Sequence, residues 1–318
     1  MFRNFLADLR YSLRVAGRLP SSDITVTNSF FLPLVLRRRT AGKIYVHVAR
    51  FPKNQMFLYS RADRLQPISQ SVARGIGRQT PWLAGKLATI GYPVPSAYFD
   101  ATQASARRST ILYVGRIARE KGVHLLLQAM RLLAARDPAA VRPWRLLIVG
   151  PHQIALGGDG PEYWRELQKL AEPLGAACEF AGPVFGEEKL IGIYRSSSIF
   201  VYPSLAEKGE AFGLAPLEAM AAGCSVIVSG LSCFDEFVED GRNALKFDHT
   251  GPRPEDNLAD KLARLMTDQR RREEIAHNGT VTARRFSPAA IASRMLADFR
   301  LLMLESAPGA TESLPQTP

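Results

Sequence analysis

The sequence predicts an α/β protein built from two Rossmann-like domains, each a parallel sheet flanked by helices. Its 318 residues suit two domains of ordinary size. Short apolar runs alternate with longer amphipathic segments, a rhythm typical of parallel strands joined by helical crossovers. Polar and glycine-containing loops stand where several apolar runs end, which is where such sheets bind ligands.

The first domain is predicted over residues 1–105. An opening helix is expected at about 4–16, where apolar residues recur at helical spacing. The elements that follow are strands at 23–29, 43–49 and 64–70 and helices at 31–39, 55–62 and 71–79. The stretch 87–110 is rich in Pro, Ser and Ala, which favours a linker and places the boundary near residue 105.

The second domain is predicted over residues 106–286 and repeats the same rhythm. Its expected strands lie at 111–115, 145–150, 178–182, 199–204 and 225–229. One helix is expected to begin at 121, and three more are expected at 162–174, 187–197 and 215–222. The loop at Gly157–Gly160 lacks the ending of a P-loop, so we interpret it as the cap of the helix after it. The polar, Pro-rich tail 305–318 is expected to be disordered.

Composition narrows the function classes. The chain carries 41 basic and 30 acidic residues, a net charge of +11, which favours anionic partners. No nucleic-acid-reading motif is present, so a nucleic-acid partner is not expected. Three widely spaced cysteines fit neither a disulfide framework nor a zinc site and indicate a reducing, cytoplasmic setting. No apolar run reaches eighteen residues, and the basic stretches 37–39 and 270–272 leave peripheral contact with an anionic membrane open.

The most informative segment runs from Glu210 to Glu218. It places two carboxylates eight positions apart, with a turn at Gly213 and a helix that opens near Pro216 between them. A helix N-terminus suits a phosphate, and ionised carboxylates accept hydrogen bonds from hydroxyl groups. Phosphate and polyol together describe a nucleotide sugar. The simpler alternative is a pair of solvated glutamates.

A second segment, residues 111–130, is consistent with that interpretation. It predicts a buried strand, a short loop and an amphipathic helix, and the loop carries Arg116 and Lys121. Fixed cations stabilise the negative charge that develops on a departing diphosphate. Two surface cations in an ordinary loop are the alternative.

These two segments resemble the donor site of retaining GT-B glycosyltransferases, family 4 (glycosyl transferases group 1). The resemblance implies that Glu210 contacts the donor sugar and Glu218 the ribose, as in the family's E-x7-E motif. It implies that the backbone of the intervening turn approaches sugar and diphosphate, and that the family's G-R-x4-K-G segment clamps the diphosphate. The corresponding residues are Phe212, Gly213 and Leu214 for the turn, and Gly115, Arg116 and Lys121 for the clamp.

The resemblance also extends to other parts of the chain. It makes Pro183 and Val184 candidates to contact the nucleobase, through their backbone. It suggests that His47 helps to orient the sugar, although a lone histidine at a strand end is more often structural. Segment 287–304 resembles the terminal helix that returns to the first domain.

The implied activity is transfer of a sugar from a nucleoside-diphosphate sugar to a saccharide or lipid-linked acceptor, with retention, by an enzyme that needs no cofactor. No D-x-D motif is present, so no metal is expected. The implied fold is GT-B, with two domains across a cleft. A homo-oligomer or partner subunit, and a place at the inner membrane face, are further expectations.

The front of the chain departs from the family pattern. It opens directly on a helix, without the strand and Gly-rich turn that normally come first, so the first domain is expected to be short by about two strands. Three explanations stay open: a misassigned start, a minimal enzyme, or a homologue that binds nucleotide sugars without turnover. A basic protein that only docks on anionic surfaces is a further alternative.

Overall fold

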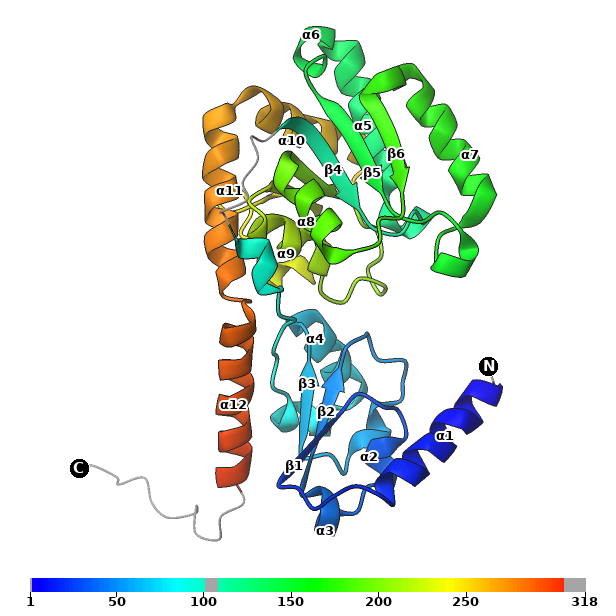
Figure 1. Cartoon of the computed structure of the whole chain (residues 1–318), viewed down its shortest axis with the longest axis vertical. Helices are drawn as coiled ribbons and strands as arrows, with labels where there is room; N and C mark the ends of the chain where they lie inside the picture. Colours follow the sequence, from blue (N-terminus) through cyan, green and yellow to red (C-terminus); the bar gives the residue numbers. More distant parts are fainter. Residues whose placement is uncertain (1, 101–107, 306–318) are drawn as a thin grey trace, which may run out of the picture. The chain divides into compact units, whose positions relative to one another are not determined.

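The computed structural model describes residues 2–100 and 108–305 (Figure 1). These residues form two compact units. The first runs to Tyr92 and resumes at Ala289, and the second comprises Pro93–Pro288. The chain therefore passes between the units twice.

The first unit is built on a parallel sheet in the order β1-β2-β3, formed by Ile24–Thr27, Lys43–Val48 and Arg64–Pro67. Ile24 pairs with Lys43, and Tyr45 pairs with Arg64. The central strand β2 is nearly continuously apolar because both of its faces are covered. The helices of this unit are α1 (Phe2–Ala16), α2 (Leu32–Val35), α3 (Arg38–Ala41), α4 (Gln70–Gln79) and α12 (Pro288–Leu304).

Helix α12 completes the first unit. Arg64 is 7% exposed, and its Nε lies 3.1 Å from Asp298 Oδ1 on α12. The ring of Tyr45 meets that of Phe299 edge to face, with centroids 5.0 Å apart. The segment expected as helix 287–304 therefore packs on the sheet of the first unit.

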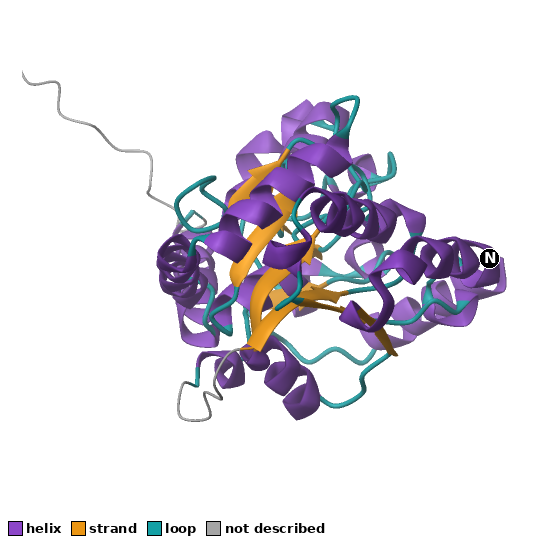
Figure 2. Cartoon of the chain, turned by 90° about the horizontal axis from the view of Figure 1, so that it is seen from above, coloured by secondary structure: helices purple, strands orange, loops and turns teal. Residues whose placement is uncertain are grey.

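The second unit contains a six-stranded parallel sheet in the order β6-β5-β4-β7-β8-β9. Figure 2 shows its strands in orange with helices in purple around them. The strands are Arg108–Val114 (β4), Arg145–Val149 (β5), Cys178–Gly182 (β6), Ser197–Tyr202 (β7), Ser225–Ser229 (β8) and Leu245–Phe247 (β9). The strand order reverses between β4 and β7, so the crevice at their carboxyl ends is the place where a doubly wound sheet binds ligands.

Seven α-helices accompany this sheet among the described residues. They are α5 (Val123–Arg136), α6 (Pro138–Val141), α7 (Gly160–Ala171), α8 (Glu187–Ser196), α9 (Leu214–Ala221), α10 (Pro254–Thr267) and α11 (Gln269–Arg284). The core lies around β7 and β8, whose residues are all buried. No described helix of either unit combines the length and the apolar composition needed to cross a membrane.

The structure corrects several expected elements. The helix expected at 55–62 is a single 3₁₀ turn, Met56–Tyr59, and the helix expected at 31–39 divides into α2 and α3 because Leu36 between them is extended. Strand β9 and helices α10 and α11 were not anticipated from the sequence.

The two units divide between Tyr92 and Pro93, not near residue 105. The Pro-rich segment packs on the second unit instead of linking the two. Val94 N–H donates to the Phe286 carbonyl at 2.8 Å, and Tyr98 is 3% exposed with its ring 5.8 Å from that of Tyr194. Residues 101–107 and most of the tail expected at 305–318 lie outside the described residues.

Candidate functional site

The loop after β4 approaches its neighbours closely. A Cβ on Gly115 would lie 2.8 Å from Tyr113 Oη, and one on Gly122 would lie 2.0 Å from the Pro203 carbonyl oxygen. Gly122 also has φ +68°, a conformation that favours glycine. The two glycines of the G-R-x4-K-G segment thus allow this loop to pack against the end of β7 and bring Lys121 inward.

Lys121 and Glu210 meet at the carboxyl ends of β4 and β7. Lys121 Nζ lies 2.6 Å from Glu210 Oε2, and the two residues are only 5% and 9% exposed. Glu210 is held by its backbone N–H, which donates to the Ala206 carbonyl at 2.8 Å. The sequence predicted that these side chains converge, and the structure brings them together.

Two tyrosines lie next to the Lys121–Glu210 pair, and they were not identified from the sequence. The rings of Tyr113 and Tyr202 stack with centroids 6.0 Å apart, and Lys121 Nζ lies 5.6 Å from the Tyr202 centroid. Burial, reinforced by Glu210, holds the pKa of Tyr202 well above its usual value. Both phenols therefore stay neutral beside the ion pair.

Arg116 lies in the same loop but faces a different set of partners. Its guanidinium donates to the Gly157 carbonyl at 2.7 Å and to Glu120 Oε1 at 2.8 Å, and the side chain is 45% exposed. A Cβ on Gly157 would lie 2.8 Å from Arg116 Cδ, so glycine leaves room for the guanidinium. Asp159 accepts the backbone N–H of Arg119 at 2.6 Å. The loop 157–160 leads into α7 with Asp159 at the N-cap position, but the Asp159 side chain braces the cationic loop and makes no capping hydrogen bond to the helix.

The turn before α9 presents backbone rather than side chains. Gly213 has φ +85°, and a Cβ there would lie 2.4 Å from the Phe234 ring. The Phe212 side chain is 2% exposed and packs against the rings of Phe237 and Phe286. Leu214 opens the helix and is 36% exposed. The N–H groups of the first turn of α9 are therefore what this segment can offer to a ligand.

Glu218 lies one helical turn further along α9, in a half-buried position. It accepts a hydrogen bond from Tyr194 Oη at 3.3 Å, and Tyr98 is a second phenolic partner. Burial raises the pKa of Glu218 to about 7, and the tyrosine hydrogen bonds oppose that rise. A carboxyl group with such a pKa changes charge near neutrality.

Pro183 and Val184 follow β6 and are half-buried. Proline has no N–H, so Pro183 can offer only its carbonyl. The next residue, Phe185, is 74% exposed and gives this end of the sheet a free aromatic face. Phe185 directly follows Val184, so its position could have marked it as a further candidate to contact the base, but it was not selected from the sequence.

The remaining candidate, His47, belongs to the first unit. Its Nδ1 lies 2.5 Å from Gln66 Oε1, and the amide of Gln66 donates to the Ile90 carbonyl. Because the Gln66 oxygen can only accept, Nδ1 of His47 is the donor in this hydrogen bond. The ring of Tyr92 lies 5.6 Å from that of His47.

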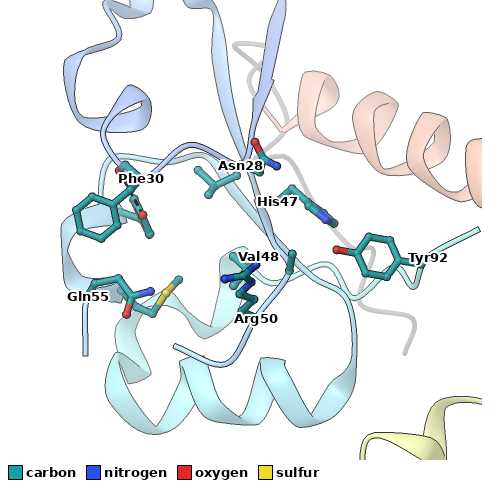
Figure 3. Close-up of a pocket in the computed structure, with 11 residues that line it drawn as sticks. Asn28, Phe30, His47, Val48, Arg50, Gln55 and Tyr92 are labelled. Carbon is teal, nitrogen blue, oxygen red and sulfur yellow. Dashed lines mark hydrogen bonds between the residues drawn. The ribbon is translucent and has the colours of Figure 1, made fainter. Parts of the chain in front are cut away.

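His47 lines a pocket of about 590 Å³. Figure 3 shows His47 and Tyr92 on one side, Phe30 and Gln55 on the other, and Arg50 between them. The other lining residues are Asn28, Val46, Val48, Ala49, Met56 and Tyr59. This lining includes aromatic surfaces and one arginine but no acidic residue, so it suits a polar ligand that carries negative charge.

Two of the other four histidines are largely buried in the second unit. His124 Nδ1 lies 2.9 Å from Tyr163 Oη, and burial lowers the pKa of His124. His249, at the end of β9, is nearly buried and lies 4.0 Å from Glu207. Within residues 2–100 and 108–305, no three His, Cys, Asp or Glu side chains gather as a metal site would require.

Comparison with known families yields a match over most of the second unit. The sequence model of the family described as "Glycosyl transferases group 1" matches residues 97–282, more than half of the chain. The chain is 34% identical over 205 residues to a D-inositol 3-phosphate glycosyltransferase of Corynebacterium urealyticum. It is 30% identical over 165 residues to a lipopolysaccharide 1,2-N-acetylglucosaminetransferase of Salmonella typhimurium.

These alignments cover 64% and 52% of the chain, but they span only 45% and 41% of the two relatives. Solved structures are similar over a larger share. HepE of Anabaena, in complex with UDP and glucose, matches with a TM-score of 0.72 at 17% identity, over 91% of this chain and 80% of its own. A trehalose 6-phosphate synthase of Burkholderia multivorans matches with a TM-score of 0.77 at 14% identity, over 99% of this chain and 79% of its own. These similarities show the GT-B fold.

Proposed function

Because this chain belongs to the glycosyl transferases group 1 family, we propose that it moves a sugar from a nucleoside-diphosphate sugar to a hydroxyl acceptor. The observation that carries the proposal is the buried contact between Lys121 and Glu210 at the switch point of the six-stranded sheet. A cation for the diphosphate and a carboxylate for sugar hydroxyls stand there side by side.

We propose the following roles at the donor site. Lys121 and Arg116 hold the diphosphate and stabilise the charge that it gains when its bond to the sugar breaks. Glu210 binds hydroxyl groups of the sugar, and Glu218 binds those of the ribose. The start of α9 from Gly213 turns N–H groups and a partial positive charge toward the phosphates.

The nucleobase would lie at the end of β6. Pro183 and Val184 would contact it through their backbone, and the exposed ring of Phe185 offers it a stacking surface. HepE of Anabaena, which shares the fold, was crystallised with UDP. Uracil is therefore the first base to test.

We propose that the acceptor is a saccharide or lipid-linked saccharide and that the pocket around His47 binds it. Because Nδ1 of His47 is occupied by Gln66, the Nε2 side of the ring is left to hydrogen-bond with an acceptor hydroxyl. Arg50 is exposed and lines the pocket, which favours an acceptor with a phosphate or carboxylate group. Transfer with retention is part of the proposal, on the family resemblance.

We further propose that the reaction needs neither a metal ion nor an organic cofactor, because Lys121, Arg116 and the start of α9 supply positive charge. The proposed setting is the cytoplasm, with peripheral contact at the inner membrane face. We also propose that the chain forms a homo-oligomer or binds a partner subunit. The net charge of +11 supports contact with an anionic membrane.

The test is sugar transfer or donor hydrolysis by the purified chain, with Glu210→Ala and Lys121→Ala. Each change is expected to lower turnover by about a hundredfold to a thousandfold. Glu207→Ala is the matched control, because Glu207 lies in the same loop with its side chain 71% exposed, and it should keep its rate. If Glu210→Ala and Lys121→Ala both keep the turnover of the unchanged chain, the assignment is refuted.

A second candidate is a homologue that binds nucleotide sugars without turnover, acting as a partner subunit. The three-stranded sheet of the first unit, half the size of the sheet in the second, favours it. Calorimetry that detects nucleoside-diphosphate-sugar binding to a chain inactive on a broad acceptor panel would support this candidate.

A further inference from the structure

Charge is divided unequally between the two units. The first unit, residues 1–92 and 289–318, holds 17 basic and 6 acidic residues, a net charge of +11. The second unit, Pro93–Pro288, holds 24 of each and is neutral. The excess positive charge of the chain therefore lies on the first unit, whereas the proposed nucleotide site lies in the neutral second unit.

Within the first unit, α1 presents an outer face that is both basic and apolar. Arg10 and Arg14 lie one turn apart along this face and are exposed. Leu13 lies on one flank with 53% of its surface exposed, and Tyr11 lies on the other flank at 61%. Leu6, one turn before Arg10, is 38% exposed, and Arg18 follows the end of the helix. We call these six residues the α1 face.

The opposite side of α1 fixes the orientation of this face. Helix α1 packs against α2 (Figure 1). Ser12 is fully buried, with its Oγ 3.3 Å from Ser29 Oγ. The only acidic residue of the helix, Asp8, lies on this inner side, 3.5 Å from Ser29 Oγ. Because Asp8 is turned inward, no acidic side chain of α1 neutralises the arginines of the outer face.

We propose that the α1 face docks on an anionic phospholipid surface. The arginines would bind lipid phosphates, and Leu6, Tyr11 and Leu13 would enter the boundary between headgroups and acyl chains. Leucine and tyrosine at helix flanks gain by leaving water there, since tyrosine keeps its hydroxyl among the headgroups. The proposal deepens the proposed membrane contact by assigning it a surface.

Charge distinguishes a lipid surface from a second copy of the chain. Two copies that met through this face with two-fold symmetry would bring Arg10 and Arg14 against the same arginines of the partner. Like charges without intervening acids oppose such a contact. A nucleic acid would satisfy the arginines but would leave the two leucines without an apolar partner.

The experiment is co-sedimentation of the full chain with vesicles of phosphatidylcholine alone or mixed with an equal amount of phosphatidylglycerol. Binding is expected only to the mixed vesicles. Arg10→Gln with Arg14→Gln is expected to weaken it by about 30-fold, because each arginine near an anionic surface contributes about fivefold. Tyr11→Ser with Leu13→Ser should leave a weak association that added salt abolishes, since only the charge term would remain.

Arg37→Gln with Arg39→Gln is the matched control. These arginines are exposed in the same unit but lie off the α1 face, so the net charge falls equally while binding should change by less than about threefold. Equal losses in the control and in the Arg10 and Arg14 variant would overturn the assignment of the face. Full binding by the Tyr11 and Leu13 variant would also overturn it. So would a concentration-dependent dimer, formed without lipid, that the α1-face variants abolish.

A duplex oligonucleotide provides a further arm, since tighter binding to it than to mixed vesicles would also contradict the proposal. Calorimetry of nucleoside-diphosphate binding tests the second unit independently, because no residue of the α1 face belongs to the proposed donor site. Vesicle binding can therefore fail while nucleotide binding persists, and the reverse outcome is equally visible. Circular dichroism of each variant checks that α1 is still folded.

Discussion

Lys121 Nζ and Glu210 Oε2 lie 2.6 Å apart although 89 residues separate them in the chain. Both side chains are almost fully buried, so each charge has lost most of its hydration. In the proposed donor site, these two groups would neutralise one another until a donor arrives. A diphosphate can bind Lys121 and a sugar hydroxyl can bind Glu210, so the substrate would replace each group's partner rather than meet bare charges.

The first prediction concerns the stability of this pair. Lys121→Met leaves Glu210 buried without its cation, and Glu210→Gln does the converse. Either change should lower the free energy of unfolding by about 3–5 kcal/mol, whereas the double variant should lose far less. Urea denaturation of the four proteins measures this double-mutant cycle.

The exposed pair Arg242 and Glu239 is the matched control. Its side chains are 73% and 51% exposed, so its cycle should give less than about 1 kcal/mol. A coupling at Lys121 and Glu210 no larger than that of the control would show that burial does not strengthen the contact.

The second prediction concerns pH. The pKa of Glu218 is raised from 4.5 to about 7, so the native state keeps a proton that the unfolded chain releases between these values. The contribution of Glu218 to the free energy of unfolding is therefore present below pH 4.5 and is lost as the pH rises to about 7. Glu218→Gln should flatten this part of the stability curve, as thermal unfolding across the pH range would reveal.

The same titration should strengthen ligand binding as the pH rises, whereas it lowers the free energy of unfolding. In the proposed site the ionised carboxylate would accept hydrogen bonds from the ribose hydroxyls, so nucleoside-diphosphate affinity is expected to rise as the pH passes through about 7. Glu218→Gln should bind more weakly and without this rise. If the affinity of the variant depends on pH as that of the unchanged chain does, Glu218 does not bind the nucleotide.

The third prediction tests the turn before α9. Gly213→Ala meets both a positive φ and the Phe234 ring, so it should destabilise the fold by about 1–3 kcal/mol. Gly192→Ala is the control, because Gly192 lies exposed within α8 and a Cβ there meets nothing within 4 Å. That change should stabilise the chain by about 1 kcal/mol. Chemical denaturation distinguishes the two signs.

The fourth prediction concerns the pocket of the first unit. Arg50→Gln should raise the KM for a phosphate- or carboxylate-bearing acceptor by roughly tenfold or more, since a charge-assisted hydrogen bond is lost. It should leave the KM for a neutral acceptor unchanged. Lys53→Gln removes a nearby exposed charge that does not line the pocket and should affect neither acceptor. Steady-state kinetics with matched acceptor pairs provides the measurement.

The sequence was sufficient to predict that Lys121 and Glu210 converge, because local patterns carried that information. Apolar strands followed by Arg116, Lys121 and Glu210 are local signals, and the parallel sheet brings their ends to one edge. The stacked pair Tyr113 and Tyr202 was not predictable in the same way. It depends on β4 and β7 being neighbours, which the order of the strands in the chain does not reveal.

The boundary of the units was misjudged for a related reason. Pro and Ser near residue 95 are typical of a linker, but Tyr98 finds a partner in Tyr194, nearly a hundred residues later. Similarly, the contacts of Arg116 were not anticipated. Glu120 lies in the same loop, but Gly157 comes from a loop whose proximity is a property of the folded sheet.

The closure of the first unit by α12 has a consequence for synthesis on the ribosome. Arg64 is made early, but Glu305, one of its two carboxylate partners, follows 241 residues later, and Asp298 lies on the same late helix. At ordinary elongation speed, this delay lasts about 10–50 s. The second unit, Pro93–Pro288, is complete before α12 has been made, so it can fold while the first unit still lacks this helix. Chains released just after residue 288 should therefore be folded in the second unit and open to proteases in the first.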